Sequence, residues 1–152
     1  MATQGTFIPA GNAYDAYVAV GRALSSATVD VLIVDPYADA KLLQHYAVQT
    51  PENTALRVLA DRKGHKSTLA PAAKDWVTQF GSLRPLEVRL AATAGSLHDR
   101  LILVDRLHAY VLGQSFNSLA ERAPTSLIRS DPDTASMKIA YYENAWDSAL
   151  PL

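Results

Sequence analysis

Apolar positions along the chain follow two alternating patterns. The first is helical: apolar side chains at three- and four-residue spacing predict a helix over residues 12–27, carried by Tyr14, Tyr17, Val18, Gly21 and Leu24. The second is extended: residues 28–34 are dense in β-branched side chains and end at Asp35-Pro36, which predicts a buried strand stopped by proline. The same patterns predict further helices over 38–48, 69–80 and 134–149, and further strands over 55–60, 86–90 and 126–129.

The order of these elements predicts the fold class. Strand, helix and strand in succession imply right-handed crossovers, so we expect an α/β fold with a mixed, mostly parallel sheet and helices on both faces. Residues 1–11 show little periodicity and contain Pro9, which predicts an irregular N-terminal arm. Residues 12–152 contain no internal repeat, and an apolar fraction of 49% is ample for one packed core, so we expect a single domain there.

A β-hairpin is the organising element of this pattern. Two arms rich in apolar residues, 96–105 and 109–117, lie on either side of a short connection at 106–108. Gly113 supplies a permissive backbone just before the polar end of the second arm. We therefore expect the two arms to pair as antiparallel strands.

The polar residues of the hairpin fall at positions that can meet. Side chains alternate along a strand, so His98 and Arg100 share one face of the first arm, and Ser115 and Asn117 share one face of the second. Four chemically useful side chains can therefore occupy one small patch. We expect a short helix over 118–122 to follow.

Composition limits the functional classes. The chain has no cysteine, which excludes a disulfide framework and a thiolate metal site and favours a reducing compartment. No signal peptide and no run of membrane-spanning length is visible, so we expect a cytoplasmic protein without membrane insertion. A formal net charge of −1 argues against long-range capture of nucleic acid, and the one local cluster of positive charge lies at 62–66.

The hairpin also carries a recognisable motif. The sequence His98-Asp99-Arg100, four apolar residues, Asp105 and then Ser115-Phe116-Asn117 resembles the phospholipase D superfamily motif, usually His-x-Lys, four residues, Asp, followed by Gly-Ser-x-Asn. The element order resembles one half of such an enzyme. The resemblance implies that one histidine attacks a phosphodiester phosphorus and a second protonates the leaving oxygen, while Lys and Asn hold the non-bridging oxygens. It implies no metal and no other cofactor.

By this resemblance the candidate catalytic residues are His98, Arg100, Ser115 and Asn117, and Asp105 has a structural role at a strand end. Each residue has an ordinary alternative. His98 can be a structural or exposed histidine, and Arg100 can pair with an acid or lie along apolar surface. Ser115 and Asn117 can cap the short helix that follows them, although a helix N-terminus is itself an anion site.

The motif departs from its usual form. Arg100 replaces lysine and keeps the charge but differs in reach and hydration, so phosphate binding should survive better than turnover. The gap from Asp105 to Ser115 is about two residues longer than usual. An insertion of even length leaves Ser115 and Asn117 on the same face of the strand. Gln114 stands where glycine is usual. This spacing resembles a divergent bacterial subgroup of the superfamily.

An orienting acid is also missing from the expected place. Family nucleases often carry a glutamate on the strand after the motif, and residues 123–126 contain none. Without it the tautomer and basicity of the His98 imidazole lack support. Glu143 or an acid elsewhere in the chain is a candidate substitute.

Only one copy of the motif is present. The two-histidine chemistry needs two copies, and His45, His65 and His108 lack the accompanying residues at the right spacing. A single-motif chain completes the site by pairing with an identical chain around a two-fold axis. We therefore predict a homodimer whose two hairpins face each other across a shared cleft.

Further residues lie beyond the carboxyl ends of the predicted strands and are candidates for lining that cleft: Asp35, Tyr37, Asp61, Arg62 and Lys63. Tyr37 can stack on a base or cover the core, and we favour the core. Asp35 and Asp61 are poor neighbours for a phosphate, so we expect them to fix loops or to pair with an arginine. The basic run at 62–66 is more typical of a solvated surface than of a polyanion clamp.

Two functional hypotheses follow. The first is a metal-independent phosphodiesterase, a nuclease acting on DNA or RNA, because short single-motif members of the superfamily are typically nucleases. The second is a catalytically weak or inactive member, used for dimerisation or for phosphate and nucleic-acid binding within a larger bacterial protein. Arg100, the missing glutamate and the near-neutral net charge support the second; His98, Ser115 and Asn117 support the first. A lipid substrate has less support, because no amphipathic membrane-binding face is visible.

Overall fold

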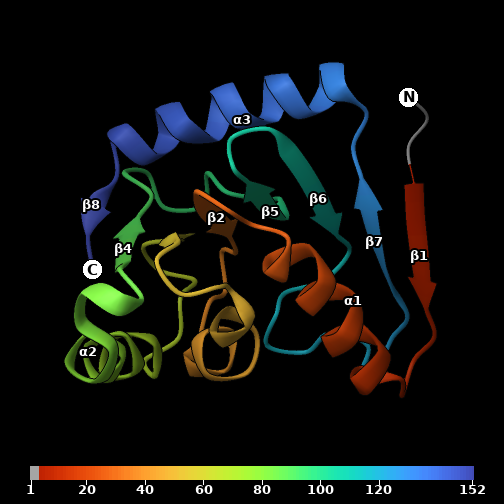
Figure 1. The fold of residues 1–152 in the computed structure, drawn as a ribbon, viewed down its shortest axis with the longest axis horizontal. Coiled ribbons are helices and arrows are strands. Elements are labelled where there is room, and N and C mark those ends of the chain that lie inside the picture. The colour runs from red at the N-terminus through yellow and green to blue at the C-terminus, as the bar shows by residue number, and fades with distance from the viewer. Residues whose placement is uncertain (1–3) are drawn as a thin grey trace.

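The computed structural model describes residues 4–152, which form one eight-stranded sheet flanked by helices (Figure 1). The strands lie in the order β1-β7-β6-β5-β2-β3-β4-β8. Their bounds are β1 (Gln4–Ile8), β2 (Asp30–Val34), β3 (Ala55–Ala60), β4 (Leu86–Leu90), β5 (Arg100–Val104), β6 (His108–Leu112), β7 (Thr125–Arg129) and β8 (Leu150–Pro151). The helices are α1 (Ala13–Ser25), α2 (Leu69–Phe80) and α3 (Pro132–Asp147), with the short turns η1 (Leu42–Tyr46), η2 (Ala47–Gln49) and η3 (Gly81–Leu83).

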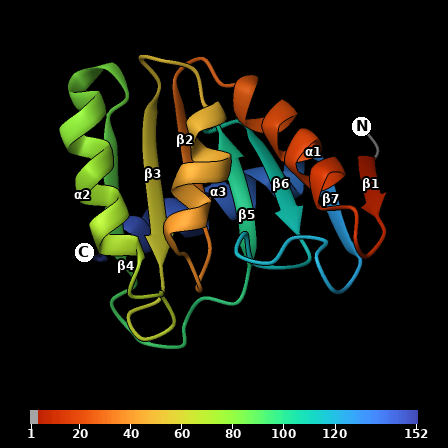
Figure 2. The ribbon, with the colours of Figure 1, turned by 90° about the horizontal axis from the view of Figure 1, so that it is seen from below.

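Helices cover both faces of the sheet. α1, α2 and η1 lie on one face, and α3 crosses the strands on the other (Figures 1 and 2). Side-chain alternation explains why β2 is buried on both sides: Val31 and Ile33 join the core under α1 and α2, while Leu32 and Val34 join the core under α3. Within residues 4–152, no helix is long and apolar enough to cross a bilayer.

The predicted α/β class, with a mixed sheet and helices on both faces, is confirmed. The helices predicted over 12–27, 69–80 and 134–149 correspond to α1, α2 and α3, and the segment at 38–48 is helical but irregular, with a π-helical turn and a 3-10 turn. The expectation of a mostly parallel sheet is wrong. Within residues 4–152 parallel pairing is confined to β2·β3 and β3·β4, and the other five strand pairs are antiparallel. The reason is that antiparallel strands extend the parallel centre on both sides: β5, β6, β7 and β1 on one side and β8 on the other.

The N-terminal segment is part of the sheet. Within the predicted arm 1–11, residues 4–8 form β1, which pairs antiparallel with β7 at the edge, and residues 1–3 lie outside the described part. Gly5 and the exposed Thr6 and Phe7 give this strand no apolar alternation, and Ile8 alone of these side chains enters the core. Its extended conformation depends on β7, a partner more than one hundred residues away that local periodicity does not reveal.

The helix predicted over 118–122 is also wrong. This segment is a series of tight turns, closed by bonds from the Ser118 amide to the Ser115 carbonyl and from the Glu121 amide to the Ser118 carbonyl. Ala120 has a φ of 53°, which a right-handed helix does not contain, and its amide donates to Oε1 of Gln114. No helix N-terminus therefore follows the hairpin to bind an anion.

Candidate active site

The candidate residues lie along one edge of the sheet, meaning here the side that is formed by the ends of the strands. The parallel strands β2, β3 and β4 end there, β5 begins there and β6 ends there, because β5 is antiparallel to both β2 and β6. This places Asp35 and Asp61 just after β2 and β3, and His98 and Arg100 at the start of β5, on the same edge. Ser115 and Asn117 follow β6 to that edge, and Tyr37, Arg62 and Lys63 lie in its loops. We call it the candidate edge.

Asp35 is the buried centre of this edge. It is fully buried, and its Oδ2 accepts hydrogen bonds from Ser115 Oγ at 2.8 Å and from the Phe116 amide at 2.9 Å. Its Oδ1 accepts from the Tyr37 amide at 3.0 Å, and Asn117 Nδ2 donates to the Tyr37 carbonyl at 3.2 Å. Asp35 thus fixes the turn after β6 against the end of β2.

The pKa of Asp35 reflects that burial. Burial raises the pKa of Asp35, and the hydrogen bonds from Ser115, Phe116 and Tyr37, together with the charge of Arg100, only partly oppose the rise. The donors that reach the carboxylate are a hydroxyl and backbone amides rather than a cation. The Ser115 hydroxyl is therefore committed to Asp35 as its acceptor.

Arg100 links the two strands of the hairpin. Its guanidinium donates to the carbonyls of His98 and Gly113, both at 3.0 Å. Arg100 Nε and Thr125 Oγ1 are buried without a hydrogen-bond partner in the described part of the chain. A Cβ on Gly113 would lie 3.3 Å from that Thr125 oxygen, so the backbone of β6 and β7 is tightly packed beside the arginine.

His98 is exposed, and its imidazole makes no hydrogen bond within residues 4–152. It lines an open groove of about 430 Å³ between the loop before β5 and α3, together with Ser96, Asp99, Thr134, Met137, Lys138, Tyr141 and Tyr142. The α3 wall was not predicted from the sequence. The sequence feature that could have indicated it is the four-residue spacing between the exposed Met137 and Tyr141 and between Lys138 and Tyr142, which places the members of each pair next to each other on the helix.

The groove floor contains a polar contact that holds the His98 loop to α3. Tyr142 Oη donates to Asp99 Oδ2 at 2.6 Å, and Lys138 Nζ lies 3.4 Å from the same oxygen. Burial acts to raise the pKa of Asp99, but the hydrogen bond from Tyr142 and the charges of Lys138 and Arg100 outweigh it and lower that pKa. Burial, with the Asp99 hydrogen bond, raises the pKa of Tyr142.

Asp61 organises the neighbouring loops. Its Oδ2 accepts from the amides of Lys63 at 2.9 Å and Gly64 at 2.6 Å, and its Oδ1 accepts from the Gly95 amide at 2.6 Å. Burial acts to raise the pKa of Asp61, and these three amides outweigh it and lower the pKa. Asp61 thus joins the loop after β3 to the loop before β5, and Arg62 reinforces that link by donating to the Ala92 carbonyl at 3.2 Å.

Tyr37 does not belong to the core, so the preference for a core role is wrong. Its side chain is 45% exposed, because the buried Asp35 and Pro36 end the strand and turn the next residue outward. Lys66 Nζ lies 5.5 Å from the centroid of its ring. Tyr37 is therefore an exposed aromatic surface on the candidate edge.

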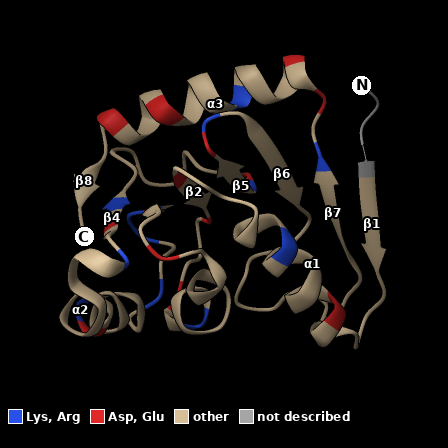
Figure 3. Ribbon diagram, in the orientation of Figure 1, with Lys and Arg blue, Asp and Glu red and all other residues tan. Residues whose placement is uncertain are grey.

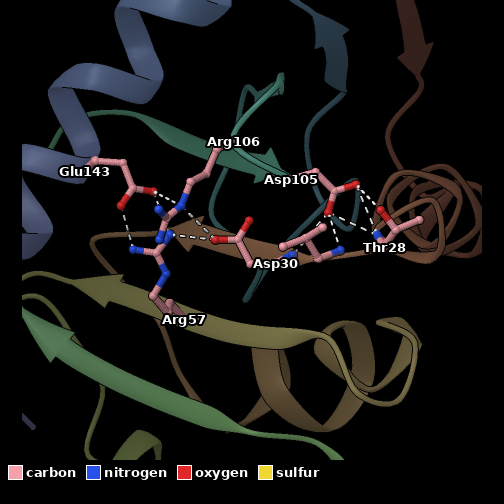
Figure 4. Close-up of polar contacts among 7 residues, drawn as sticks. Thr28, Asp30, Arg57, Asp105, Arg106 and Glu143 are labelled. Carbon is pink, nitrogen blue, oxygen red and sulfur yellow. Dashed lines mark hydrogen bonds and ion pairs between the residues drawn. The ribbon is translucent and has the colours of Figure 1, made fainter.

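Asp105 lies at the opposite edge, where it fixes the tight turn between β5 and β6. Its carboxylate accepts from the amides of Thr28, Val29 and Asp30 and from Thr28 Oγ1, with distances of 2.7–3.1 Å (Figure 4). Asp105 and Arg106 have φ values of 56° and 54°, and the Leu107 amide donates to the Val104 carbonyl, as in a type I′ turn.

Glu143 also lies at the opposite edge and does not orient His98. Its two oxygens accept from Arg57 at 2.7 and 2.6 Å, and Arg57 and Arg106 both bond to Asp30 at 3.1 Å (Figure 4). The hydrogen bonds and charge of Arg57 hold the pKa of Glu143 below its ordinary value against the effect of burial. This cluster fastens α3 to β2, β3 and the β5–β6 turn.

Charges elsewhere are interspersed along the elements, as Figure 3 shows, in keeping with a net charge of −1. Among residues 4–152, no group of three or more His, Asp or Glu side chains is arranged to hold a metal ion.

Comparison with known proteins gives the fold. No protein-family model matches the sequence, and no curated protein matches it. The structure is similar to Nuc from Salmonella typhimurium, a phospholipase D family member, with a TM-score of 0.70 at 16% identity over 99% of this chain and 97% of Nuc. It is equally similar to NucT from Helicobacter pylori, with a TM-score of 0.70 at 12% identity over 99% of this chain and 100% of NucT.

A longer protein contains the same fold. TrmBL2, an archaeal chromatin protein described as having a novel mode of DNA binding, matches with a TM-score of 0.60 at 13% identity, over 98% of this chain and 54% of TrmBL2. At these identities the similarities establish a phospholipase D-like fold.

Proposed function

We propose that this chain is a metal-independent phosphodiesterase, specifically a nuclease, with a site shared across a homodimer. The observation that carries the proposal is the gathering of His98, Arg100, Ser115 and Asn117 at one edge of a sheet with the fold of Nuc and NucT. In this proposal the chain is a single-motif, divergent His-Asp-Arg member of the phospholipase D superfamily. We further propose a bacterial, cytoplasmic protein.

The proposed reaction uses a covalent histidine intermediate. A ring nitrogen of His98 attacks phosphorus and forms a P–N bond while the P–O bond to the leaving group breaks, and the partner's His98 gives its proton to the leaving oxygen. Water then attacks phosphorus and gives its proton to the partner's His98, now neutral, which breaks the P–N bond and restores both imidazoles. Arg100 supplies positive charge beside His98, and the Asn117 amide retains a second N–H beyond its bond to Tyr37.

The second histidine must come from a second copy. His98 is exposed at the rim of its groove, where a two-fold related chain can approach it. Met137 and Tyr141, 68% and 62% exposed beside it, are apolar side chains that such a partner would cover. We propose the dimer contact at this surface.

A second candidate function is a catalytically weak or inactive dimerisation and phosphate- or nucleic-acid-binding module of a larger protein. It is favoured by a specific observation: among residues 4–152 no carboxylate is hydrogen-bonded to the His98 ring, and Glu143 is committed to Arg57. Ser115 and Asn117 are likewise committed to Asp35 and to the Tyr37 carbonyl. The presence of the same fold as about half of TrmBL2 agrees with a module.

Hydrolysis in EDTA tests the proposal. The substrates are bis-p-nitrophenyl phosphate and single- and double-stranded nucleic acid, and wild type is compared with His98→Ala. We expect His98→Ala to lose roughly a thousandfold or more in rate. His45→Ala is the matched control: His45 is an exposed histidine on η1 that packs against Tyr17 and Tyr46, and its loss should leave the rate unchanged.

The outcomes separate the two candidates. Hydrolysis that His98→Ala retains does not come from this site and overturns the proposal. Absence of hydrolysis, with retained binding of inorganic phosphate or nucleic acid, favours the module. Light scattering that gives a strict monomer at micromolar concentration contradicts the shared site.

A further inference from the structure

We infer that Tyr37 and Lys66, with Arg62 and Lys63, form a binding surface for single-stranded nucleic acid that flanks the candidate edge. Tyr37 stacks on an unpaired base, and the three cations hold the adjoining phosphates. We call these four residues the Tyr37 platform. The inference rests on the proposed function in so far as it names the substrate class of that site.

The platform is connected directly to the candidate catalytic residues. The carbonyl of Tyr37 accepts from Asn117 Nδ2 at 3.2 Å, and its amide donates to Asp35 at 3.0 Å. Asp35 in turn accepts from Ser115 at 2.8 Å. Backbone atoms make these hydrogen bonds of Tyr37, and its side chain is 45% exposed beside Lys66. A nucleotide on this ring therefore lies next to a phosphate bound at Asn117.

The loop that carries the cations is held in place before any ligand binds. Asp61 accepts from the amides of Lys63 and Gly64, and the Lys66 amide donates to the Ala38 carbonyl at 2.9 Å. Gly64 packs so closely that an added Cβ would lie 3.0 Å from the Pro36 carbonyl oxygen. The loop after β3 is thus fastened to the loop that contains Tyr37, and little ordering entropy opposes binding.

The charge of the platform is not neutralised by the protein. Within residues 4–152, Arg62, Lys63 and Lys66 form no salt bridge, and both oxygens of Asp61, at the start of their loop, accept from backbone amides. With an overall charge of −1, the chain lacks a long-range field, so polyanion binding depends on such a local group. The lysine beside the ring favours a ligand that offers a π-face and a phosphate together.

A single-stranded polynucleotide is the ligand class that supplies both. Exposed aromatic rings bind single strands by base stacking, which is tolerant of sequence, and cations follow the phosphates. A small phosphodiester lacks a base for the ring, and a duplex keeps its bases stacked inside. We therefore expect the platform to distinguish single strands from duplexes of the same length.

Fluorescence anisotropy of a fluorescein-labelled oligo-dT, in EDTA and with His98→Ala as the background, measures binding without cleavage. We expect Tyr37→Ala to weaken binding roughly tenfold and Tyr37→Phe to restore it, because stacking needs the ring alone. We expect Lys66→Ala to weaken binding and to reduce the slope of log K against log salt by about 0.7, the value for one phosphate contact on a single strand.

Two control variants make the same substitutions, tyrosine to alanine and lysine to alanine, at exposed positions outside the platform. Tyr14→Ala removes a 76% exposed tyrosine on α1, and Lys74→Ala removes an exposed lysine on α2. Both should bind as the background does, and an unlabelled duplex should compete less well than the single strand. Lys66 is exposed, so its variant tests the platform even if Tyr37→Ala disturbs the fold.

The inference is overturned if the background protein fails to bind oligo-dT, or if Tyr37→Ala and Lys66→Ala bind like their controls. Its failure is distinguishable from failure of the proposed function. Hydrolysis of bis-p-nitrophenyl phosphate that depends on His98, with binding indifferent to Tyr37 and Lys66, contradicts only the platform. Binding that depends on Tyr37 and Lys66, without His98-dependent hydrolysis, contradicts only the enzyme.

Discussion

The two edges of the sheet each contain an acid, the buried Asp35 and the half-buried Glu143, in opposite electrostatic settings. At the candidate edge, Asp35 accepts only from a hydroxyl and backbone amides, and burial raises its pKa. At the opposite edge, Glu143 is paired with Arg57 through two hydrogen bonds, and its pKa is lowered. The same residue class thus positions a loop at one edge and anchors a helix at the other.

This difference explains which charges are available to a ligand. At the opposite edge, Arg57 and Arg106 are engaged with Asp30 and Glu143, so the cluster is internally compensated. At the candidate edge, Asp35 and Asp61 accept from neutral donors, and the basic loop after β3 has no carboxylate partner among the described residues. The cluster at the opposite edge joins α3 to the sheet, whereas the cations of the basic loop are the ones that the proposed Tyr37 platform uses for binding.

The largest effect on stability is expected from breaking the opposite edge. Glu143→Ala removes both hydrogen bonds that Arg57, whose side chain is 11% exposed, makes to Glu143 and leaves it with Asp30 alone, so we expect a loss of about 3 kcal/mol in the free energy of unfolding. Urea unfolding measures it. The control Glu87→Ala removes a 56% exposed partner of Arg89 and should change the stability by less than about 0.5 kcal/mol. Equal stability of the two variants would contradict the anchoring role.

A smaller loss is expected when the turn beside that cluster is altered. Asp105→Ala removes the acceptor of the Thr28, Val29 and Asp30 amides and keeps a φ of 56°, at a cost of about 2–3 kcal/mol. Asp105→Gly removes the backbone strain but does not restore the lost hydrogen bonds, and Asp105→Asn keeps one accepting oxygen. The midpoints of unfolding should therefore decrease in the order Asn, Gly, Ala. An alanine variant as stable as wild type would refute this account.

The smallest effect is the pH dependence, and its sign differs between the edges. Glu143 has a lowered folded pKa, so it contributes stability above its ordinary pKa that is lost as pH falls through the folded value. Asp35 has a raised folded pKa, so its contribution is fully present below its ordinary pKa and is lost as pH rises through the folded value.

Unfolding measured between about pH 3 and 7 tests both signs. Glu143→Gln should make stability fall less on acidification than in wild type. Asp35→Asn removes a contribution that grows as pH falls, so it should make stability fall more on acidification than in wild type. Identical pH profiles for the two variants would show that the edges do not differ in this way.

Local pattern was sufficient to predict much of the fold. Periodicity predicted α1, α2 and α3 and strands β2, β3 and β4, since each buries an apolar face whose spacing is visible in a short window. β1 and the two-residue β8 were missed, because edge strands bury little and depend on distant partners. The turns at 118–122 were missed because a left-handed Ala120 has no local signal.

The shared position of the motif residues was predictable from the sequence, but their contacts were not. The motif spacing brought His98, Arg100, Ser115 and Asn117 to one edge. It did not reveal that Asp35 receives the Ser115 hydroxyl, because the two residues are 80 positions apart. The α3 wall of the groove likewise depends on how α3 crosses the sheet, which periodicity does not specify.

The most direct test of the central claim is a search for the covalent intermediate on His98. Wild-type protein turning over bis-p-nitrophenyl phosphate in EDTA is quenched in alkali, digested and mapped by mass spectrometry. We predict a phosphoryl adduct on the peptide that contains His98, absent from His98→Ala and present in His45→Ala. An adduct on another residue, or turnover by wild type that His98→Ala fully retains, would contradict the proposal that this edge hydrolyses phosphodiesters through His98.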